Sequence, residues 1–161
     1  MLLTCKIDNI EIKRETNPAI SLKTFLKETL KIINIKGNCD KGYCGNCGVT
    51  ISGQYALSCL VPVFMIQKKE IFTIQGFSTT EEYKEIEKIF LAKKVFPCPA
   101  CAPARILLAH SILENAHNIM EEKNISDQIS GINCTCISKK DYASVILEIQ
   151  KEREKRHDKT R

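Results

Sequence analysis

Nine cysteines in a chain of 161 residues constrain its fold more than any other feature of the sequence, because eight of them fall into two sets. In the first set, Cys39, Cys44 and Cys47 have the spacing C-x4-C-x2-C, and Cys59 follows farther along. This spacing with a remote fourth cysteine is an established ligand pattern of [2Fe-2S] clusters. The tight loop wraps round one iron while the chain returns to complete the ligand set. We therefore predict a [2Fe-2S] cluster on these four thiolates.

The second set consists of Cys98 and Cys101, which are separated by two residues, and Cys134 and Cys136, which are separated by one. If all four bind one metal centre, they pin together the beginnings of two predicted helices. Four thiolates also suit zinc, so a zinc site remains an alternative for both sets. A C-x-C pair is, however, too tight for a common zinc knuckle. We therefore predict a second [2Fe-2S] cluster here.

Three glycines in and after the first cysteine loop, Gly42, Gly45 and Gly48, are predicted to help bind the cofactor. Glycine can adopt positive φ and has no Cβ, so it can bring backbone amides close to inorganic sulfide. The ninth cysteine, Cys5, lies on the apolar face of an alternating segment. We predict that it belongs to the core rather than to a metal site.

Composition and charge argue against several other classes of protein. No export signal is visible, and no stretch approaches the roughly eighteen apolar residues of a membrane span. We therefore expect a cytoplasmic protein whose thiols bind metal rather than form disulfides. Residues 151–161 contribute six Lys or Arg against three Asp or Glu to the net charge of +5, and the chain has no Trp. We expect no nucleic-acid binding and no catalytic site on this chain.

The first half of the chain is predicted to be a small mixed sheet with one helix. Alternating apolar residues indicate strands, and apolar residues at helical spacing after Ser21, a good N-cap, indicate a helix. The expected strands cover 3–7, 10–13, 49–51 and 71–74, with the helix over 22–30 and the cysteine loop over 37–48. This order predicts a β-grasp, ferredoxin-like [2Fe-2S] domain over residues 1–77.

After Gly76 the apolar residues follow a period of 3.6, which indicates helices. Ser78 with Glu81, or Thr79 with Glu82, are candidates for a capping box at the first of them. The helices are expected over 80–93, 103–120, 126–131 and 139–156. The predicted fold class is therefore α+β, with an all-α, four-helix-bundle-like [2Fe-2S] domain over residues 78–150 and a charged C-terminal tail over 151–161.

Three motifs in the first half are similar to those of a known family. Residues 39–47, CDKGYCGNC, resemble the pattern C-x-x-G-x-C-G-x-C, residues 53–59 resemble G-x4-S-C, and residues 73–77, TIQGF, resemble T-I-E-G-L. These patterns are typical of the small iron-sulfur subunit, or N-terminal domain, of the molybdenum hydroxylases, which include xanthine dehydrogenase, aldehyde oxidoreductase and carbon monoxide dehydrogenase. The resemblance extends over about residues 2–150.

The second half resembles the same family with clear departures. Residues 97–104, PCPACAPA, align with Q-C-G-x-C-T-P-G, so Pro97 replaces the glutamine that in the family reaches towards the pterin of the molybdenum cofactor. Residues 131–138, GINCTCIS, align with G-N-x-C-R-C-T-G-Y, so Thr135 replaces the arginine and the Gly-Tyr pair is lost. All four cysteines are kept.

The resemblance implies an electron-transfer subunit of a larger oxidoreductase complex. A cluster on the second cysteine set would lie nearer a subunit that carries the molybdenum cofactor, and a cluster on the first set would pass electrons to a flavin subunit or another acceptor. The molybdenum cofactor and FAD are thus expected only on partner subunits. Two alternatives remain, namely a divergent two-cluster ferredoxin that serves a non-molybdenum partner and a zinc-stapled adaptor protein.

Overall fold

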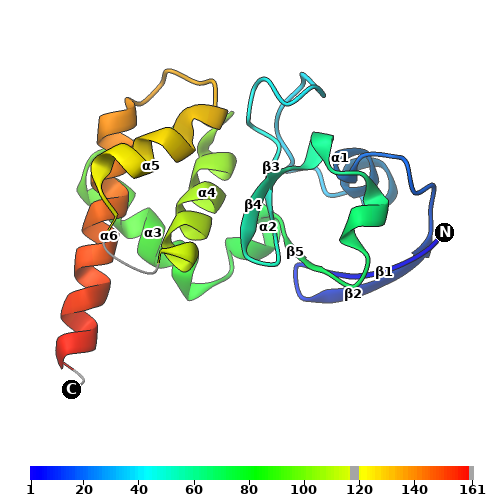
Figure 1. Cartoon of the computed structure of the whole chain (residues 1–161), viewed down its shortest axis with the longest axis horizontal. Coiled ribbons are helices and arrows are strands. Elements are labelled where there is room, and N and C mark those ends of the chain that lie inside the picture. The colour runs from blue at the N-terminus through cyan, green and yellow to red at the C-terminus, as the bar shows by residue number, and fades with distance from the viewer. Residues whose placement is uncertain (117–119, 160–161) are drawn as a thin grey trace.

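The computed structural model describes residues 1–116 and 120–159, with side chains up to Arg156. A mixed sheet forms the N-terminal half and helices form the C-terminal half, with the two ends of the chain far apart (Figure 1). The elements in chain order are β1 (Leu2–Ile7), β2 (Ile10–Glu15), α1 (Leu22–Thr24), η1 (Phe25–Thr29), β3 (Gly48–Ile51), β4 (Gln54–Leu57), η2 (Ser58–Leu60), η3 (Val63–Ile66), β5 (Glu70–Phe72), α2 (Ile74–Phe77), α3 (Glu81–Ala92), α4 (Ala102–Asn115), α5 (Glu122–Gln128), η4 (Ile129–Gly131) and α6 (Lys139–Lys159).

The sheet has five strands in the order β2-β1-β5-β3-β4. β1 and β2 form an antiparallel hairpin, and its turn residues Asp8 and Asn9 have φ of 49° and 68°. β5 pairs with β1 in parallel and with β3 in antiparallel register. The alternation predicted for the first strand is confirmed, since Leu3, Cys5 and Ile7 are buried while the residues between them are exposed.

The helix predicted after Ser21 is confirmed, but it is not a regular α-helix. The Ser21 hydroxyl accepts a hydrogen bond from the backbone N–H of Thr24 at 3.1 Å, which caps the first turn. After α1 the chain widens into the π-helix η1, closed by the N–H of Leu30 donating to the carbonyl of Phe25. Phe25 and Leu26 on this segment are fully buried in the core of the N-terminal half.

Several predicted boundaries differ from the structure. Strand β4 was not predicted, and the last strand ends at Phe72 because Thr73 caps α2. Neither proposed capping box forms, since Thr80 is the N-cap of α3 and accepts from the N–H of Tyr83. α4 ends at Asn115 rather than at 120, and residues 117–119 lie outside the described residues. α5 begins earlier than expected, and α6 extends three residues beyond its predicted end.

Each half has its own hydrophobic core. One core lies between the sheet and α1–η1, and the other joins α2, α3, α4, α5 and α6. The halves meet where α4 packs against β3 and β4, and the backbone N–H of Tyr55 donates to the Ser111 hydroxyl across this contact at 2.9 Å. Phe77 was placed in the first predicted domain, yet its ring belongs to the helical core. The centre of this ring lies 4.5 Å from the centre of the His110 ring.

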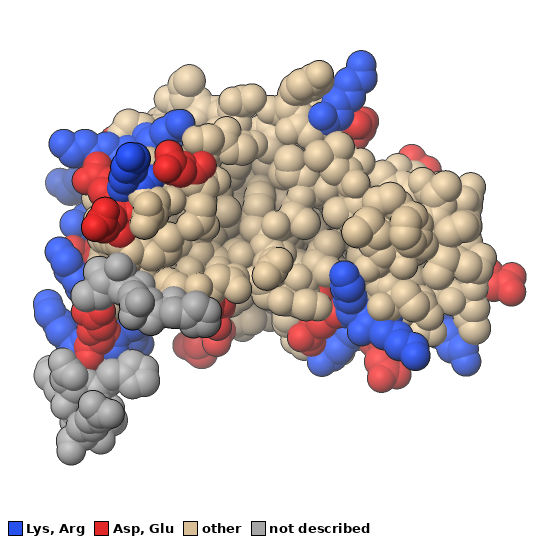
Figure 2. Space-filling view, viewed as in Figure 1, with Lys and Arg blue, Asp and Glu red and all other residues tan. Residues whose placement is uncertain are grey.

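The charged side chains do not gather into a patch of one sign on the face shown in Figure 2. Blue and red side chains alternate over the helical half on this face. Elsewhere in the helical half, Glu85 on α3 accepts hydrogen bonds from Arg153 and Arg156 on α6. The middle of this face is largely uncharged. Among the described helices, none is both long and apolar enough to cross a membrane.

Candidate metal centres

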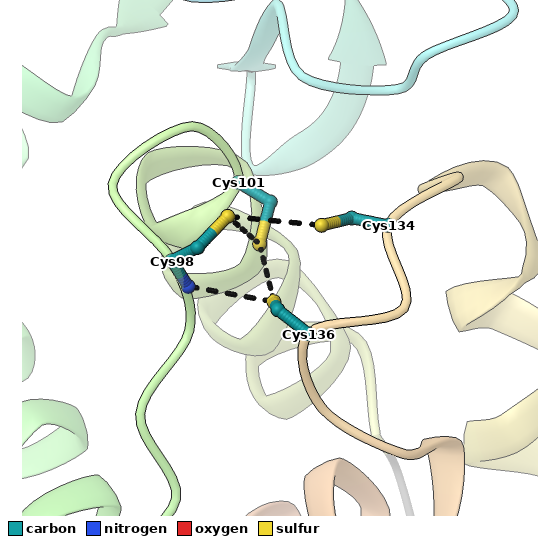
Figure 3. A group of neighbouring side chains, drawn as sticks. All are labelled: Cys98, Cys101, Cys134 and Cys136. Atoms are coloured by element: carbon teal, nitrogen blue, oxygen red, sulfur yellow. Dashed lines mark hydrogen bonds between the residues drawn. The ribbon is translucent and has the colours of Figure 1, made fainter.

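The four cysteines of the second set converge from two loops (Figure 3). Cys98 and Cys101 precede α4, and Cys134 and Cys136 precede α6. Their four sulfur atoms all lie within 4.8 Å of one another. The individual Sγ–Sγ distances are 3.7 Å for Cys98–Cys101, 3.7 Å for Cys98–Cys134 and 3.3 Å for Cys101–Cys136. These loops thus present four soft ligands to one point, which is what an iron-sulfur or zinc centre needs.

Backbone amides and burial act in opposite directions on these thiols. Hydrogen bonds from the N–H groups of Cys101 and Ala100 lower the pKa of Cys98 to about 7. Burial raises the pKa of Cys101 to about 12, although the Arg105 guanidinium opposes the rise. Burial also raises the pKa of Cys136, but hydrogen bonds, the first from the N–H of Cys98, outweigh it and the net shift is downward. The site therefore offers some thiolates directly and keeps others protonated until a metal replaces the proton.

The four cysteines of the first set form two pairs. The Sγ atoms of Cys39 and Cys44 are 3.3 Å apart, and the backbone N–H of Cys44 donates to the sulfur of Cys39. Hydrogen bonds from backbone N–H groups, the first that of Lys41, lower the pKa of Cys39 to about 6. Cys59 contacts Cys47, and burial followed by this contact raises its pKa to about 11. In the part of the chain that the structure describes, only the second set gathers three or more ligand atoms within 4.8 Å.

Two of the three glycines predicted to shape the first loop have the expected backbone conformation. Gly42 has φ of +77° and Gly45 has φ of +72°. A Cβ on Gly45 would lie 2.0 Å from the carbonyl oxygen of Gly131 in the other cysteine-bearing loop. Glycine at position 45 therefore permits both a left-handed backbone and the close approach of the two loops.

The reason given for the third glycine is wrong, because Gly48 does not have positive φ and instead begins strand β3. It is required for another reason, since the ring of Tyr55 fills the space of its Cβ at 2.4 Å. Gly37, which was not predicted, has φ of +88°, and its Cβ would lie 3.0 Å from the sulfur of Cys44. Its position at the start of the loop was a usable signal. Cys5 is buried as predicted, and burial raises its pKa to about 11.

The two cysteine-bearing loops are hydrogen-bonded to each other, which the sequence did not indicate. The backbone N–H of Asn133 donates to the carbonyl of Cys44 at 3.2 Å. The Asn133 side-chain amide donates to the carbonyl of Tyr43 at 2.7 Å. Within the first half, the Tyr55 hydroxyl on β4 also holds this loop, since it donates to the carbonyl of Gly45 at 2.9 Å. Residues adjoining one cysteine set therefore fix the position of the other.

Two buried cations that the sequence did not indicate also lie beside the cysteines. Lys23 donates from its Nζ to the Gly37 carbonyl and to Asp40 Oδ1, each at 2.5 Å. Arg105 donates from Nη2 to the carbonyl of Cys134 at 2.8 Å. Its Nε and Nη1 are buried and have no hydrogen-bond partner among the described residues. A buried cation beside four thiols fits a centre that carries negative charge, so these residues suit a thiolate-bound iron-sulfur group.

Comparisons with known proteins agree with this chemistry. Residues 73–146 match the family described as a [2Fe-2S] binding domain. The chain is 26% identical over 164 residues to the aldehyde oxidoreductase iron-sulfur-binding subunit of Escherichia coli strain K12. This alignment covers 93% of this chain and 70% of that protein. It is 27% identical over 111 residues to the isoquinoline 1-oxidoreductase subunit alpha of Brevundimonas diminuta, covering 69% and 72%.

Solved structures have the same fold. Quinoline 2-oxidoreductase from Pseudomonas putida 86 aligns with a TM-score of 0.77 and 24% identity, covering 91% of this chain and 90% of that chain. The aldehyde oxidoreductase from Desulfovibrio gigas aligns with a TM-score of 0.79 and 18% identity. That alignment covers 92% of this chain but 17% of the much longer neighbour. The combination of a five-stranded sheet and a helical half is thus shared with these enzymes.

Proposed function

We propose that this chain, which is similar to the small [2Fe-2S] iron-sulfur subunits of the molybdenum hydroxylases and diverges from them in its second half, relays electrons between partner subunits. One cluster would be bound by Cys39, Cys44, Cys47 and Cys59, and the other by Cys98, Cys101, Cys134 and Cys136. When bound, such clusters supply one-electron redox chemistry. The chain itself has no role in substrate chemistry in this proposal.

The proposal divides the chain into two cluster-binding domains. Residues 1–77 would form a β-grasp, ferredoxin-like domain, which is supported by the strand order and by the parallel pairing of β1 with β5. Residues 78–150 would form a four-helix-bundle-like domain, which is supported by the separate helical core. In residues 151–161 helix α6 continues to Lys159, and residues 160 and 161 lie outside the described residues.

The observation that carries the relay is the contact between the two cysteine-bearing loops. The N–H of Asn133 donates to the carbonyl of Cys44, and Asn133 is bonded directly to Cys134. One hydrogen bond and one peptide link therefore connect a cysteine of the first set to a cysteine of the second. An electron that arrives at either site has a short, continuous path of bonded atoms to the other.

The residues around the sulfurs support this role in two ways. Backbone N–H groups donate to the sulfurs of Cys39 and Cys98, which stabilises their thiolate forms and holds ligands in position. Burial of Cys47 and Cys101 keeps water away from one side of each set. All nine cysteines are free in the structure. We place the protein in the cytoplasm, where a reducing environment keeps thiols available for metal binding.

The partners follow from the family. We propose that the site on Cys98 faces a subunit with the molybdenum cofactor and that the site on Cys39 faces a flavin subunit or another acceptor. Pro97 cannot make the pterin contact of the family's glutamine, since it has no side-chain amide. Isolation of the complex from native cells tests this assignment, because a molybdopterin-containing chain should accompany this one. A complex without molybdopterin would favour a ferredoxin serving a different partner.

Metal analysis and electron paramagnetic resonance (EPR) test the two-cluster proposal on the full chain purified without oxygen. We expect about four irons and about four acid-labile sulfides per chain, with two EPR signals after reduction by dithionite. Cys47→Ser should remove one signal and Cys101→Ser the other, whereas the core variant Cys5→Ser should keep both. A colourless protein with about two zinc ions and no iron would overturn the proposal and support a zinc adaptor.

A further inference from the structure

Arg105 is the largest fully buried side chain among the described residues. It is 1% exposed and lies on α4 one turn after Cys101, whose carbonyl accepts its backbone N–H. Its guanidinium lies 5.4 Å from the centre of the Tyr142 ring. The Tyr142 hydroxyl donates to the backbone carbonyl of Arg105, so Tyr142 contacts both the backbone and the guanidinium of this residue. The side chain is thus fixed against the second cysteine set.

The charge of Arg105 has no carboxylate to balance it. Within the described ranges, the ion pairs involve other cations, and Arg105 is in none of them. Among the described residues, only Nη2 has an oxygen acceptor, the carbonyl of Cys134, while Nε and Nη1 are buried without one. A buried cation without a counter-charge is strongly unfavourable, so an anion must complete its surroundings. Arg105 lies beside the second cysteine set, since it donates to the carbonyl of Cys134 and acts on the pKa of the Cys101 thiol.

We infer that Arg105 is the counter-ion of the second cluster and raises its reduction potential, an inference that rests on the proposed function. One-electron reduction adds one negative charge to a cluster. A fixed positive charge in a site of low dielectric constant stabilises the reduced state more than the oxidised state.

The test compares charge with hydrogen bonding on the full, cluster-loaded chain. Arg105→Gln keeps an amide donor for the Cys134 carbonyl but removes the charge, and Arg105→Lys keeps the charge on a flexible side chain. EPR-monitored titration with dithionite as the reductant gives each cluster's potential. We expect Arg105→Gln to weaken the electron affinity of the second cluster tenfold to a hundredfold, where each tenfold step is 59 mV for one electron. Arg105→Lys should change it less than threefold.

The first cluster serves as an internal reference, because its signal should keep its potential in both variants. Equal shifts in Arg105→Gln and Arg105→Lys, or no shift in either, would overturn the inference. If the second signal is lost in the glutamine variant and retained in the lysine variant, a counter-ion role is supported, whereas its loss in both is evidence against that role. Absence of both signals from the unmodified chain would instead overturn the proposed function.

Discussion

The two cysteine sites bring sulfur atoms together by using different parts of the fold. Three cysteines of the first lie in a glycine-rich loop before β3 and Cys59 lies in η2, and its sulfurs lie in pairs such as Cys39 with Cys44. The second is built where helices begin, and its four sulfurs lie within 4.8 Å of one another. Left-handed glycines shape the first site, whereas the N-terminus of α4 and the loop before α6 position the second. The first site thus has the more specific sequence motif, whereas the second site has the four sulfurs that lie closer together.

The sites also differ in how their neighbouring cation is balanced. Lys23 beside the first site is hydrogen-bonded to the carboxylate of Asp40. Burial alone would lower its pKa, but Asp40, and after it Cys47 and Cys59, raise the pKa overall. Arg105 beside the second site has no such carboxylate in the described structure. The first site thus has a neutral ion pair for a neighbour, and the second has an uncompensated charge.

Gly45→Ala should have the largest effect, because it damages both sites at once. The new Cβ would lie 2.0 Å from the carbonyl oxygen of Gly131, and the residue would have to keep φ of +72°. We expect a loss of at least about 3 kcal/mol in the free energy of unfolding, measured by urea denaturation, and weakening of both EPR signals. Gly53→Ala is the matched control, since Gly53 has φ of +81° but nothing within 4 Å of its Cβ. It should lose about 1 kcal/mol. Equal losses would mean that the loops do not need this close approach.

Removal of any bound metal should expose a large difference in thiol reactivity between Cys39 of the first set and Cys101 of the second. The pKa of Cys39 is lowered to about 6, so its thiol is ionised at pH 7.5, whereas burial raises the pKa of Cys101 to about 12 and keeps it protonated. Because the thiolate is the nucleophile, Cys39 should react with iodoacetamide on the order of a hundredfold faster than Cys101. Mass spectrometry of the chelator-treated chain measures both rates. Similar rates for the two cysteines would contradict the difference in their surroundings.

Local chemistry could be predicted from the sequence better than contacts between the halves. The alternation of Leu3, Cys5 and Ile7 and the cap at Ser21 depend on neighbouring residues, and both are confirmed. β4 was missed because Gln54–Leu57 is short and mostly half-buried, so its alternation is weak. Packing and hydrogen bonds determine where the π-helix η1 forms and which residue caps α3. The spacing of apolar residues in the sequence does not reveal either.

The spacing of the cysteines predicted two ligand sets, and the structure brings the four sulfurs of the second set within 4.8 Å of one another. The surroundings of the cysteines could not be predicted. Arg105 stands in an apolar helix, and nothing in its neighbours indicates that it reaches Cys134, which lies 29 residues farther along. For Gly48 the sequence predicted a wrong reason. Its place at the end of the cysteine loop suggested positive φ, but the structure needs glycine there to accommodate the ring of Tyr55. Contacts between distant segments decide these roles.

Asn133→Ala tests how much the contact between the loops depends on a single side chain. It removes the hydrogen bond from the Asn133 amide to the Tyr43 carbonyl but leaves the backbone N–H that reaches Cys44. Because this hydrogen bond is exposed, we expect a loss of about 1 kcal/mol in the free energy of unfolding. Asn124→Ala, on the exposed face of α5, is the control and should change stability by less than about 0.5 kcal/mol. A loss of several kcal/mol in Asn133→Ala would mean that the side chain, rather than the backbone, joins the loops.

The smallest effect is expected when the ion pair of the first site is removed as a unit. In the double variant Lys23→Met with Asp40→Asn, one positive and one negative charge disappear together, so the net field at the first site changes little. The electron affinity of the first cluster should change less than threefold in the same EPR titration, although Lys23 donates to the Gly37 carbonyl at the start of the cysteine loop. Because Asp40 is largely exposed, solvent screens its charge and leaves a small residual effect of Lys23. A shift as large as that of Arg105→Gln would show that Asp40 does not balance Lys23, and the contrast between a paired and an unpaired cation would fail.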